Sequence, residues 1–343
     1  MSSTDIVIQT EHLSPEAADW LARRCTLVVC SYTDPKFAEV VAEAAGLVVR
    51  TYTKVDERLL EAASKLKVVG RAGAGVDNID VSACRTRGVE VVYTPDANTQ
   101  AVVEYVITLM SNALRPRVTL TVPVDASEWK YLRAQTVGRR QMSELTLGLL
   151  GLGRVGKRLA EVAGAIGFDV IYNDLVEIPP PQRFGARPVS VEQLFADSDV
   201  LSLHVDGRER NRHFVNEGLI RRLKPNVVFI NTSRGFVVDS SALADFLRAH
   251  VRALAMLDVH DPEPFGSDYP LLGLSNARLY PHLASRTEAA MLNMSWVVKD
   301  VVAVLEGEKP RYPAPPCGKL EHHPDHGKNH NGDYDACDQQ QER

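Results

Sequence analysis

The sequence predicts an α/β protein built from two doubly wound domains, and three observations lead to that prediction. Short runs of strand-forming apolar residues alternate with amphipathic helical segments along most of the chain. With 343 residues, the chain is too long for one typical core and short for three. Near its middle, a glycine-rich turn follows an apolar strand and opens a helix, as the start of a second α/β unit would.

The first unit is expected to be a small α/β domain. Helical spacing of apolar residues occurs at 15–24 and 36–45, and Gly46 and Gly88 each stand just before a strand, as a helix-ending glycine does. Strands are predicted at 5–8, 26–30, 47–49, 67–69 and 89–92.

The second unit is expected to follow a long connecting helix at 101–114, which ends before Pro116. The stretch 119–144 is less regular and mixes Trp129 and Tyr131 with arginines, so we expect a projecting arm. Strands are then predicted at 145–150, 169–173, 200–204, 227–231, 253–257 and 277–279.

Composition excludes several classes of function. Apolar residues make up 45% of the chain and charged residues 24%, and no apolar run approaches the roughly 20 residues of a membrane helix. The net charge of −5 argues against binding to nucleic acid. The N-terminus lacks a basic segment followed by an apolar one, so we expect no secretory signal and a cytoplasmic location.

The C-terminal tail and the cysteines suggest no metal site. Residues 322–343 contain no Val, Ile, Leu, Met, Phe or Trp, so a disordered tail is expected. Its four histidines with Cys337 could bind a metal, but a solvated tail is the favoured interpretation. The five cysteines form no CxxC pair, which favours reduced thiols.

The glycine-rich turn has the spacing GxGxxG at Gly151, Gly153 and Gly156. The first glycine permits the tight turn, the second lets a pyrophosphate approach the backbone, and the third lets the helix pack on the strand. Asp174 follows 18 residues after Gly156, where a carboxylate binds ribose hydroxyls and repels a 2′-phosphate. NAD is therefore favoured over NADP, with a flavin nucleotide or a ligand-free structural turn as alternatives.

Three polar segments follow apolar strands further along the chain. They carry Arg234, then Asp258 with Glu263, then His282. Because the carboxyl ends of strands face the ligand crevice in a doubly wound sheet, these side chains are expected to converge there. Singly, they could equally be a surface arginine, capping carboxylates and a loop histidine.

Through these residues, with residues 73–80, Asn98, Glu104 and His204, the chain resembles the D-isomer-specific 2-hydroxyacid dehydrogenases up to about residue 312. The resemblance implies a Rossmann NAD-binding domain inserted into a smaller flavodoxin-like substrate domain, and a homodimer built on the arm and the NAD domain. We accordingly expect a discontinuous substrate domain at 1–100 plus 295–316, an NAD domain at 101–294 and the polar tail at 317–343.

The resemblance also implies the roles of the polar residues. Arg234 would hold the substrate carboxylate, His282 would be the acid/base, and Glu263 would orient the imidazole. Asp258 would face the nicotinamide. The cofactor-binding residues implied are Gly151, Gly153, Arg154, Val155, Gly156, Asp174, His204, Val205, Thr232, Ser233, Asp258 and Ser285.

Within that family, the N-terminal half resembles the phosphoglycerate dehydrogenases. Arg50 and Arg71 are predicted to lie at strand ends and to grip a second anion on the substrate, with structural salt bridges as the alternative. Ala74 replaces a common threonine, and a different continuation follows His204, which leaves other doubly anionic acids open. The predicted substrate-binding residues are Arg50, Arg71, Ala72, Gly73, Ala74 and Asn98.

Other functions of the same fold stay open at this stage. One is a glyoxylate or hydroxypyruvate reductase, and another is an NAD(H)-sensing co-repressor that acts through a protein partner. A formate or phosphite dehydrogenase is disfavoured by the phosphoglycerate-like segments.

Overall fold

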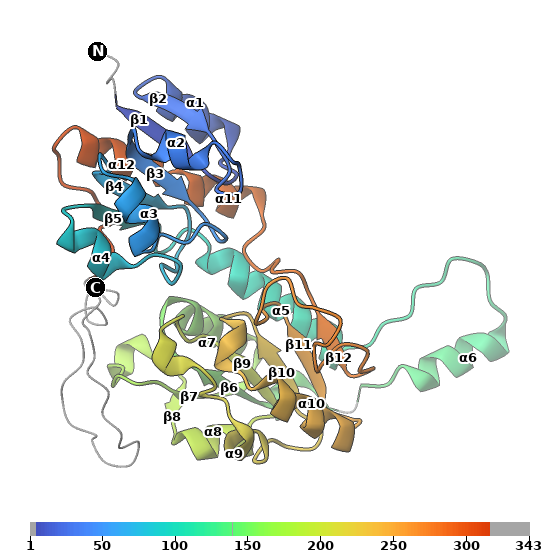
Figure 1. The fold of residues 1–343 in the computed structure, drawn as a ribbon. Coiled ribbons are helices and arrows are strands. Elements are labelled where there is room, and N and C mark those ends of the chain that lie inside the picture. The colour runs from blue at the N-terminus through green and yellow to red at the C-terminus, as the bar shows by residue number, and fades with distance from the viewer. Residues whose placement is uncertain (1–4, 139, 316–343) are drawn as a thin grey trace. The chain divides into compact units, whose positions relative to one another are not determined.

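The computed structural model describes residues 5–138 and 140–315, which divide into two compact α/β units (Figure 1). Unit 1 contains the described residues up to Asn98 and those from Arg286 onward, and unit 2 is Thr99–Ser285. The predicted tail at 317–343 lies outside the described residues. In the described part of the chain, no helix combines the length and apolar character needed to cross a bilayer.

Unit 1 contains a five-stranded parallel sheet in the order β2-β1-β3-β4-β5, the flavodoxin-like order that we predicted. The strands are β1 (Ile6–Gln9), β2 (Thr26–Val29), β3 (Ala44–Val49), β4 (Val68–Arg71) and β5 (Glu90–Tyr93). The helices are α1 (Pro15–Ala22), α2 (Phe37–Val41), α3 (Glu57–Ala62), α4 (Val81–Thr86), α11 (Glu288–Ser295) and α12 (Val298–Leu305).

The C-terminal helices complete this unit by packing on its sheet. A Cβ atom at Gly70 would stand 2.4 Å from Cγ2 of Val301, so the glycine lets α12 approach β4 closely. A Cβ atom at Gly46 would be nearest to Val7 of β1, at 3.1 Å, and 3.4 Å from Val301. We predicted Gly46 to end a helix, but it lies inside β3, because helix α2 ends already at Val41.

The boundaries of the two units differ from the predicted ones. The chain leaves unit 1 after Asn98 rather than after residue 100, and it returns at Arg286 rather than at residue 295. Helix α11 therefore belongs to unit 1, because it packs against α1. Ser295 at its end accepts a 2.9 Å hydrogen bond from the backbone N–H of Ser14.

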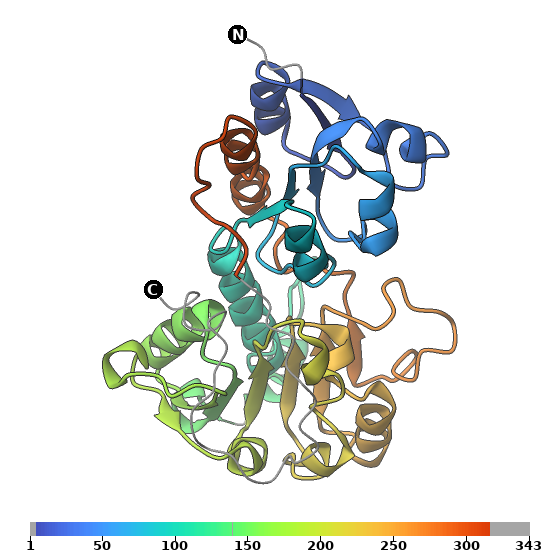
Figure 2. The same cartoon turned by 60° about the vertical axis from the view of Figure 1, so that its left-hand side comes forward.

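Unit 2 contains a seven-stranded parallel sheet in the order β12-β11-β10-β9-β6-β7-β8, with helices on both faces (Figure 2). The strands are β6 (Thr146–Leu150), β7 (Asp169–Asn173), β8 (Arg187–Pro188), β9 (Val200–Leu203), β10 (Val228–Asn231), β11 (Leu254–Leu257) and β12 (Ala277–Leu279). The helices are α5 (Thr99–Leu114), α6 (Ala126–Gln135), α7 (Arg154–Ile166), α8 (Val191–Asp197), α9 (Glu217–Ile220) and α10 (Ser240–Ala249).

Two apolar cores, one on each face, hold this sheet. Leu147 and Leu149 of β6 point into the core formed with α5 and α7, whereas Leu150 points into the core formed with α8 and α10. This is the alternation of a strand that is covered on both sides. Both faces are therefore occupied by packing, and only the strand ends are left for function.

The predicted arm contains helix α6, which the sequence pattern did not reveal. Asp125 begins this helix by accepting hydrogen bonds from the N–H groups of Ser127 and Glu128, at 2.7 and 2.8 Å. None of its residues is buried, and Trp129 and Tyr131 are 51% and 63% exposed. Figure 1 shows α6 standing clear of the sheet of its own unit.

Candidate active site

The glycine-rich turn lies at the point where the strand order of unit 2 reverses. After β6 the chain places β7 on one side, and from β9 onward it builds on the other side. Gly151 has φ of +94°, and a Cβ atom there would stand 2.6 Å from the carbonyl oxygen of His204, which follows β9. Only glycine fits this turn, and ligands bind at such switch points in doubly wound sheets.

The three glycines differ in what surrounds them. A Cβ atom at Gly156 would come within 2.3 Å of the Gly151 carbonyl oxygen, so Gly156 is needed for packing. At Gly153, nothing lies within 4 Å of the position a Cβ atom would take, and no side chain caps helix α7 there. The turn thus keeps an open cradle at the amino end of α7, which fits a pyrophosphate.

Asp174, the predicted ribose ligand, is tied to this turn. Its Oδ2 accepts a hydrogen bond from the N–H of Leu152 at 2.5 Å, and its Oδ1 accepts one from Val176 at 3.1 Å. The carboxylate is partly exposed beside the glycines. It is therefore placed where an adenosine ribose would lie if the cradle holds the pyrophosphate.

His204 also lies at this edge and is electrically neutral. Burial lowers the pKa of its imidazole to about 4. Its Nε2 is 2.9 Å from Oγ of Ser202. Backbone atoms of His204 and Val205 lie beside Gly151, and the neutral imidazole adds no charge at this edge.

The loop after β10 is held by Asn231, a residue that sequence reasoning did not assign to the site. Its Oδ1 accepts from the N–H and Oγ of Ser233 at 3.0 and 2.7 Å, and its Nδ2 donates to the carbonyl of Arg234 at 2.9 Å. Next along the chain, a Cβ atom at Gly235 would stand 2.0 Å from the His260 carbonyl carbon. The loop that carries Arg234 is thus pressed against the one that carries Glu263.

Thr232, in the same loop, has a buried hydroxyl with no hydrogen-bond partner among the described residues. Buried polar atoms are rarely left unsatisfied, so an orphaned hydroxyl at this edge is an independent sign that a polar ligand binds there. This observation and the cradle at Gly153 both fit the predicted dinucleotide.

Asp258 holds the loop that carries His282. Its Oδ1 accepts from the N–H of Leu283 and its Oδ2 from that of Ala284, both at 2.8 Å, while its carbonyl accepts from the N–H of His282 at 2.9 Å. Burial raises the pKa of Asp258 above its ordinary value, although these N–H groups oppose the shift. Asp258 has no exposed surface, and its place on the nicotinamide side stays a prediction.

His282 and Glu263 form a pair. Nδ1 of His282 lies 2.8 Å from Oε2 of Glu263, whose Oε1 accepts from the N–H of His260 at 2.8 Å. Burial alone would raise the pKa of Glu263, but the hydrogen bonds and charge of these partners bring the net pKa below its ordinary value. The carboxylate is therefore anionic at neutral pH, and Nε2 of the imidazole is left for a reacting group.

His260 supports this pair and was also not found from the sequence. Its Nε2 lies 2.9 Å from the Tyr280 carbonyl oxygen, and its Nδ1 lies 3.3 Å from the Tyr269 hydroxyl. The ring is thereby fixed between the segments that follow β11 and β12. The sequence around His260 does not distinguish a histidine that supports the site from a catalytic one.

Arg50, predicted to bind substrate, belongs to unit 1, and its guanidinium has no carboxylate within 4.0 Å in the described ranges. Its guanidinium hydrogen-bonds the sulfur of Met291 at 3.1 Å and the His12 carbonyl at 3.4 Å. Burial lowers its pKa, and the positive charge of Arg286 adds to the effect. Among the described residues, Arg50 therefore does not form the structural salt bridge that was the alternative to substrate binding.

Glu11 fixes the loop that follows Arg50. Its carboxylate accepts from four consecutive backbone N–H groups, those of residues 50–53, at 2.9 to 3.2 Å. Burial alone would raise the pKa of Glu11, but these four donors bring it below the ordinary value. The loop is a built anion nest that an internal carboxylate already fills.

The other predicted substrate residues fall into two groups. Arg71 curls back over Gly73, where a Cβ atom would lie 1.2 Å from its Nη1, and Ala74 and Asn98 are partly exposed. Ala72 and Gly73 are buried, and the N–H of Ala72 donates to the Val49 carbonyl at 2.9 Å, so a substrate contact of these two residues stays a prediction.

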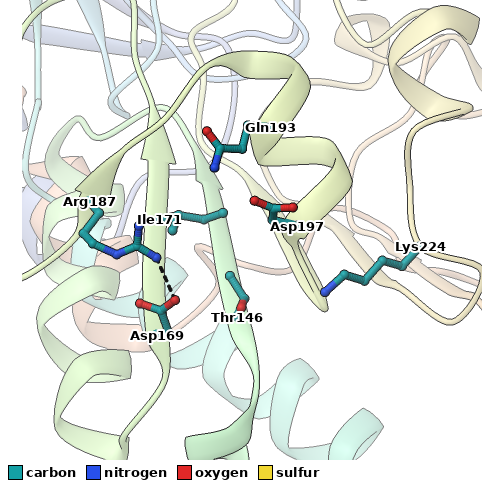
Figure 3. Close-up of a pocket in the computed structure, with 7 residues that line it drawn as sticks. All are labelled: Thr146, Asp169, Ile171, Arg187, Gln193, Asp197 and Lys224. Carbon is teal, nitrogen blue, oxygen red and sulfur yellow. Dashed lines mark hydrogen bonds and ion pairs between the residues drawn. The ribbon is translucent and has the colours of Figure 1, made fainter.

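A hollow of about 280 Å³ in unit 2 is unrelated to this site (Figure 3). It lies at the amino ends of β6, β7 and β8, where Thr146, Asp169 and Arg187 begin these strands. Arg187 pairs with Asp169 at 2.8 Å inside it. The cradle for a dinucleotide is at the opposite edge of the sheet.

Comparison with known proteins also indicates a dinucleotide-binding domain. Residues 107–284 match the NAD-binding domain of D-isomer-specific 2-hydroxyacid dehydrogenases. The chain is 34% identical over 306 residues to a D-3-phosphoglycerate dehydrogenase from Archaeoglobus fulgidus, covering 88% of this chain and 57% of that one. It therefore spans only about half the length of the phosphoglycerate dehydrogenases it matches.

Other relatives match over nearly their whole length. An (S)-sulfolactate dehydrogenase from Chromohalobacter salexigens is 33% identical over 305 residues, covering 87% of this chain and 97% of that one. The crystal structure of a glyoxylate reductase from Paecilomyes thermophila has a TM-score of 0.78 and 28% identity, covering 91% of this chain and 98% of that one.

The cradle can be tested by replacing Gly153 with Val. Since the protein itself leaves this position open, the variant is expected to fold normally, with NADH affinity reduced at least about tenfold by the clash with pyrophosphate. Fluorescence titration with NADH and thermal unfolding provide the two measurements. Unchanged NADH affinity in a folded variant would show that the dinucleotide does not use this turn.

Proposed function

Because the chain belongs to the D-isomer-specific 2-hydroxyacid dehydrogenase family, we propose that it interconverts a D-2-hydroxy acid and its 2-oxo acid with NAD. The observation that carries the proposal is the 2.8 Å pair of His282 and Glu263 at the strand edge that also holds the Gly151 turn. The edge thus combines a proton donor and acceptor with a dinucleotide cradle.

The residues of unit 2 divide the chemistry among them. When bound, the nicotinamide exchanges the hydride with C2 of the substrate. The guanidinium of Arg234 binds the substrate carboxylate. Nε2 of His282 gives a proton to the C2 oxygen during reduction and removes it during oxidation, while Glu263 keeps the imidazole oriented through Nδ1.

Asp174 supports NAD rather than NADP as the cofactor. Its carboxylate already accepts an N–H from the glycine-rich turn, so it is fixed beside the cradle. A 2′-phosphate placed there would meet a negative charge, whereas a 2′-hydroxyl would find an acceptor.

A substrate with two anionic groups is supported by unit 1. Arg50 is half-buried, has no carboxylate partner in the described part of the chain, and is next to the charge of Arg286. Such an arginine gains from an anionic ligand. The names of two relatives refer to acids with a second acidic group, phosphoglycerate and sulfolactate. Reduction of glyoxylate or hydroxypyruvate is the second candidate, supported by the match to a glyoxylate reductase.

For assembly and location, we propose a cytoplasmic homodimer, with no nucleic-acid or membrane partner. The exposed aromatic side chains of α6, Trp129 and Tyr131, are the surface that a second copy would cover.

A substrate panel with a His282→Ala variant tests the activity. NADH oxidation is expected with at least one of 3-phosphohydroxypyruvate, sulfopyruvate, hydroxypyruvate, glyoxylate and 2-oxoglutarate. In the variant, kcat should fall at least about a thousandfold while NADH affinity is kept, because only the proton transfer is lost. NADH-dependent capture of a protein partner without turnover on the panel would instead favour the co-repressor function.

Replacing Arg50 with Gln tests the second anion. The variant should raise KM for the doubly anionic substrate roughly 10- to 100-fold, the loss of one charge-assisted hydrogen bond, with little change for glyoxylate. Arg58→Gln, at an exposed position of α3, is the matched control. An equal effect of Arg50→Gln on both substrates would remove Arg50 from recognition of the second anion.

A further inference from the structure

Unit 1 contains a second hollow, of about 380 Å³, between the end of β5 and the helices α11 and α12. It shares no residue with the proposed substrate set. Its volume lies within the range of pockets that hold small ligands, about 300 to 1,000 Å³.

Two polar side chains that are more than nine-tenths buried line this hollow. Thr94 is 8% exposed, and its hydroxyl has no hydrogen-bond partner among the described residues. Asp300 is also 8% exposed, and its Oδ1 accepts the N–H of Arg311 at 2.7 Å. The buried hydroxyl of Thr94 has no partner, and in the described ranges no charged side-chain nitrogen lies within 4.0 Å of the Asp300 carboxylate, so the hollow offers both groups to a polar ligand.

Two cations resting on aromatic rings form the rim. Nζ of Lys299 lies 4.2 Å from the centre of the Trp296 ring, and the guanidinium carbon of Arg311 lies 4.9 Å from that of Tyr312. Within residues 5–138 and 140–315, neither cation has a carboxylate within 4.0 Å. Both charges are thus available to an anionic group, and the rings offer an apolar wall.

We propose that this hollow binds a small zwitterion, an α-amino acid with an apolar side chain. Its ammonium group donates to the Asp300 carboxylate and the Thr94 hydroxyl. Its carboxylate faces Lys299 and Arg311, and its side chain packs on Trp296 and Tyr312. A simple anion could accept from the Thr94 hydroxyl, but it would place a negative charge beside the buried carboxylate of Asp300.

The ligand would contact the segment that leads out of unit 1. Thr94 begins the loop after β5, and the chain leaves the unit after Asn98. Binding at Thr94 would order residues 94–98, so slower amide hydrogen exchange in this segment is a second expected sign of occupancy.

Calorimetric titration of the full chain with L-leucine, L-valine and L-phenylalanine tests the proposal. At least one is expected to bind with Kd below about 1 mM. Two analogues of L-leucine serve as controls: 4-methylpentanoate lacks the ammonium group and 3-methylbutylamine lacks the carboxylate. Each should bind at least about tenfold more weakly than L-leucine, since one charge-assisted contact is lost. No binding of the three amino acids, or equal affinity for the carboxylate-only compound, would overturn the proposal.

Variants locate the site. Three single variants, Lys299→Gln, Asp300→Asn and Thr94→Val, are each expected to weaken amino-acid binding at least about tenfold. Lys299 is exposed, so its variant should fold. Lys309→Gln, at an exposed position outside the hollow, should bind as the unmodified chain does. Thermal unfolding checks that each variant is folded. Unchanged affinity in folded Lys299→Gln and Thr94→Val would place any binding elsewhere.

Discussion

The hydrogen bonds of Asp258 to the segment 282–284 are the constraint on which the proposed site depends. His282 has φ of +55°, a left-handed conformation that costs a non-glycine residue about 1 kcal/mol. Three bonds from one buried aspartate hold the backbone there. They fix the imidazole at the end of β12, where Glu263, carried by the loop after β11, can reach its Nδ1.

The parallel sheet supplies the rest of the geometry. Because β10, β11 and β12 are neighbours with the same direction, the loops that carry Arg234, Glu263 and His282 meet at one edge. The loop after β6 joins them at the switch point, where Gly151 touches the backbone of His204. Contacts that only glycine permits therefore bring cofactor and proton chemistry to the same edge.

The sequence was sufficient for features that depend on local pattern. The alternation of apolar segments predicted both sheets except for the two-residue strand β8, and the glycine spacing predicted the cradle, because each follows from periodicity or from backbone requirements. Features that depend on distant contacts were missed. Gly46 was misread since it pairs in the sheet with Val7, 39 positions away, and the return to unit 1 was placed too late since α11 packs on α1. Asn231 and His260 act through hydrogen bonds to backbone, which leave no spacing to recognise.

The turnover of a Glu263→Gln variant tests the central claim, that an anionic carboxylate orients the imidazole of His282. The pKa of Glu263 lies below its ordinary value, so this partner is negative throughout the neutral range. Glutamine keeps the length of the side chain and removes its charge, so kcat for reduction should fall at least about tenfold while NADH affinity is kept. Glu192→Gln, at an exposed position, is the control. A kcat for Glu263→Gln identical to that of the unmodified protein would contradict the account.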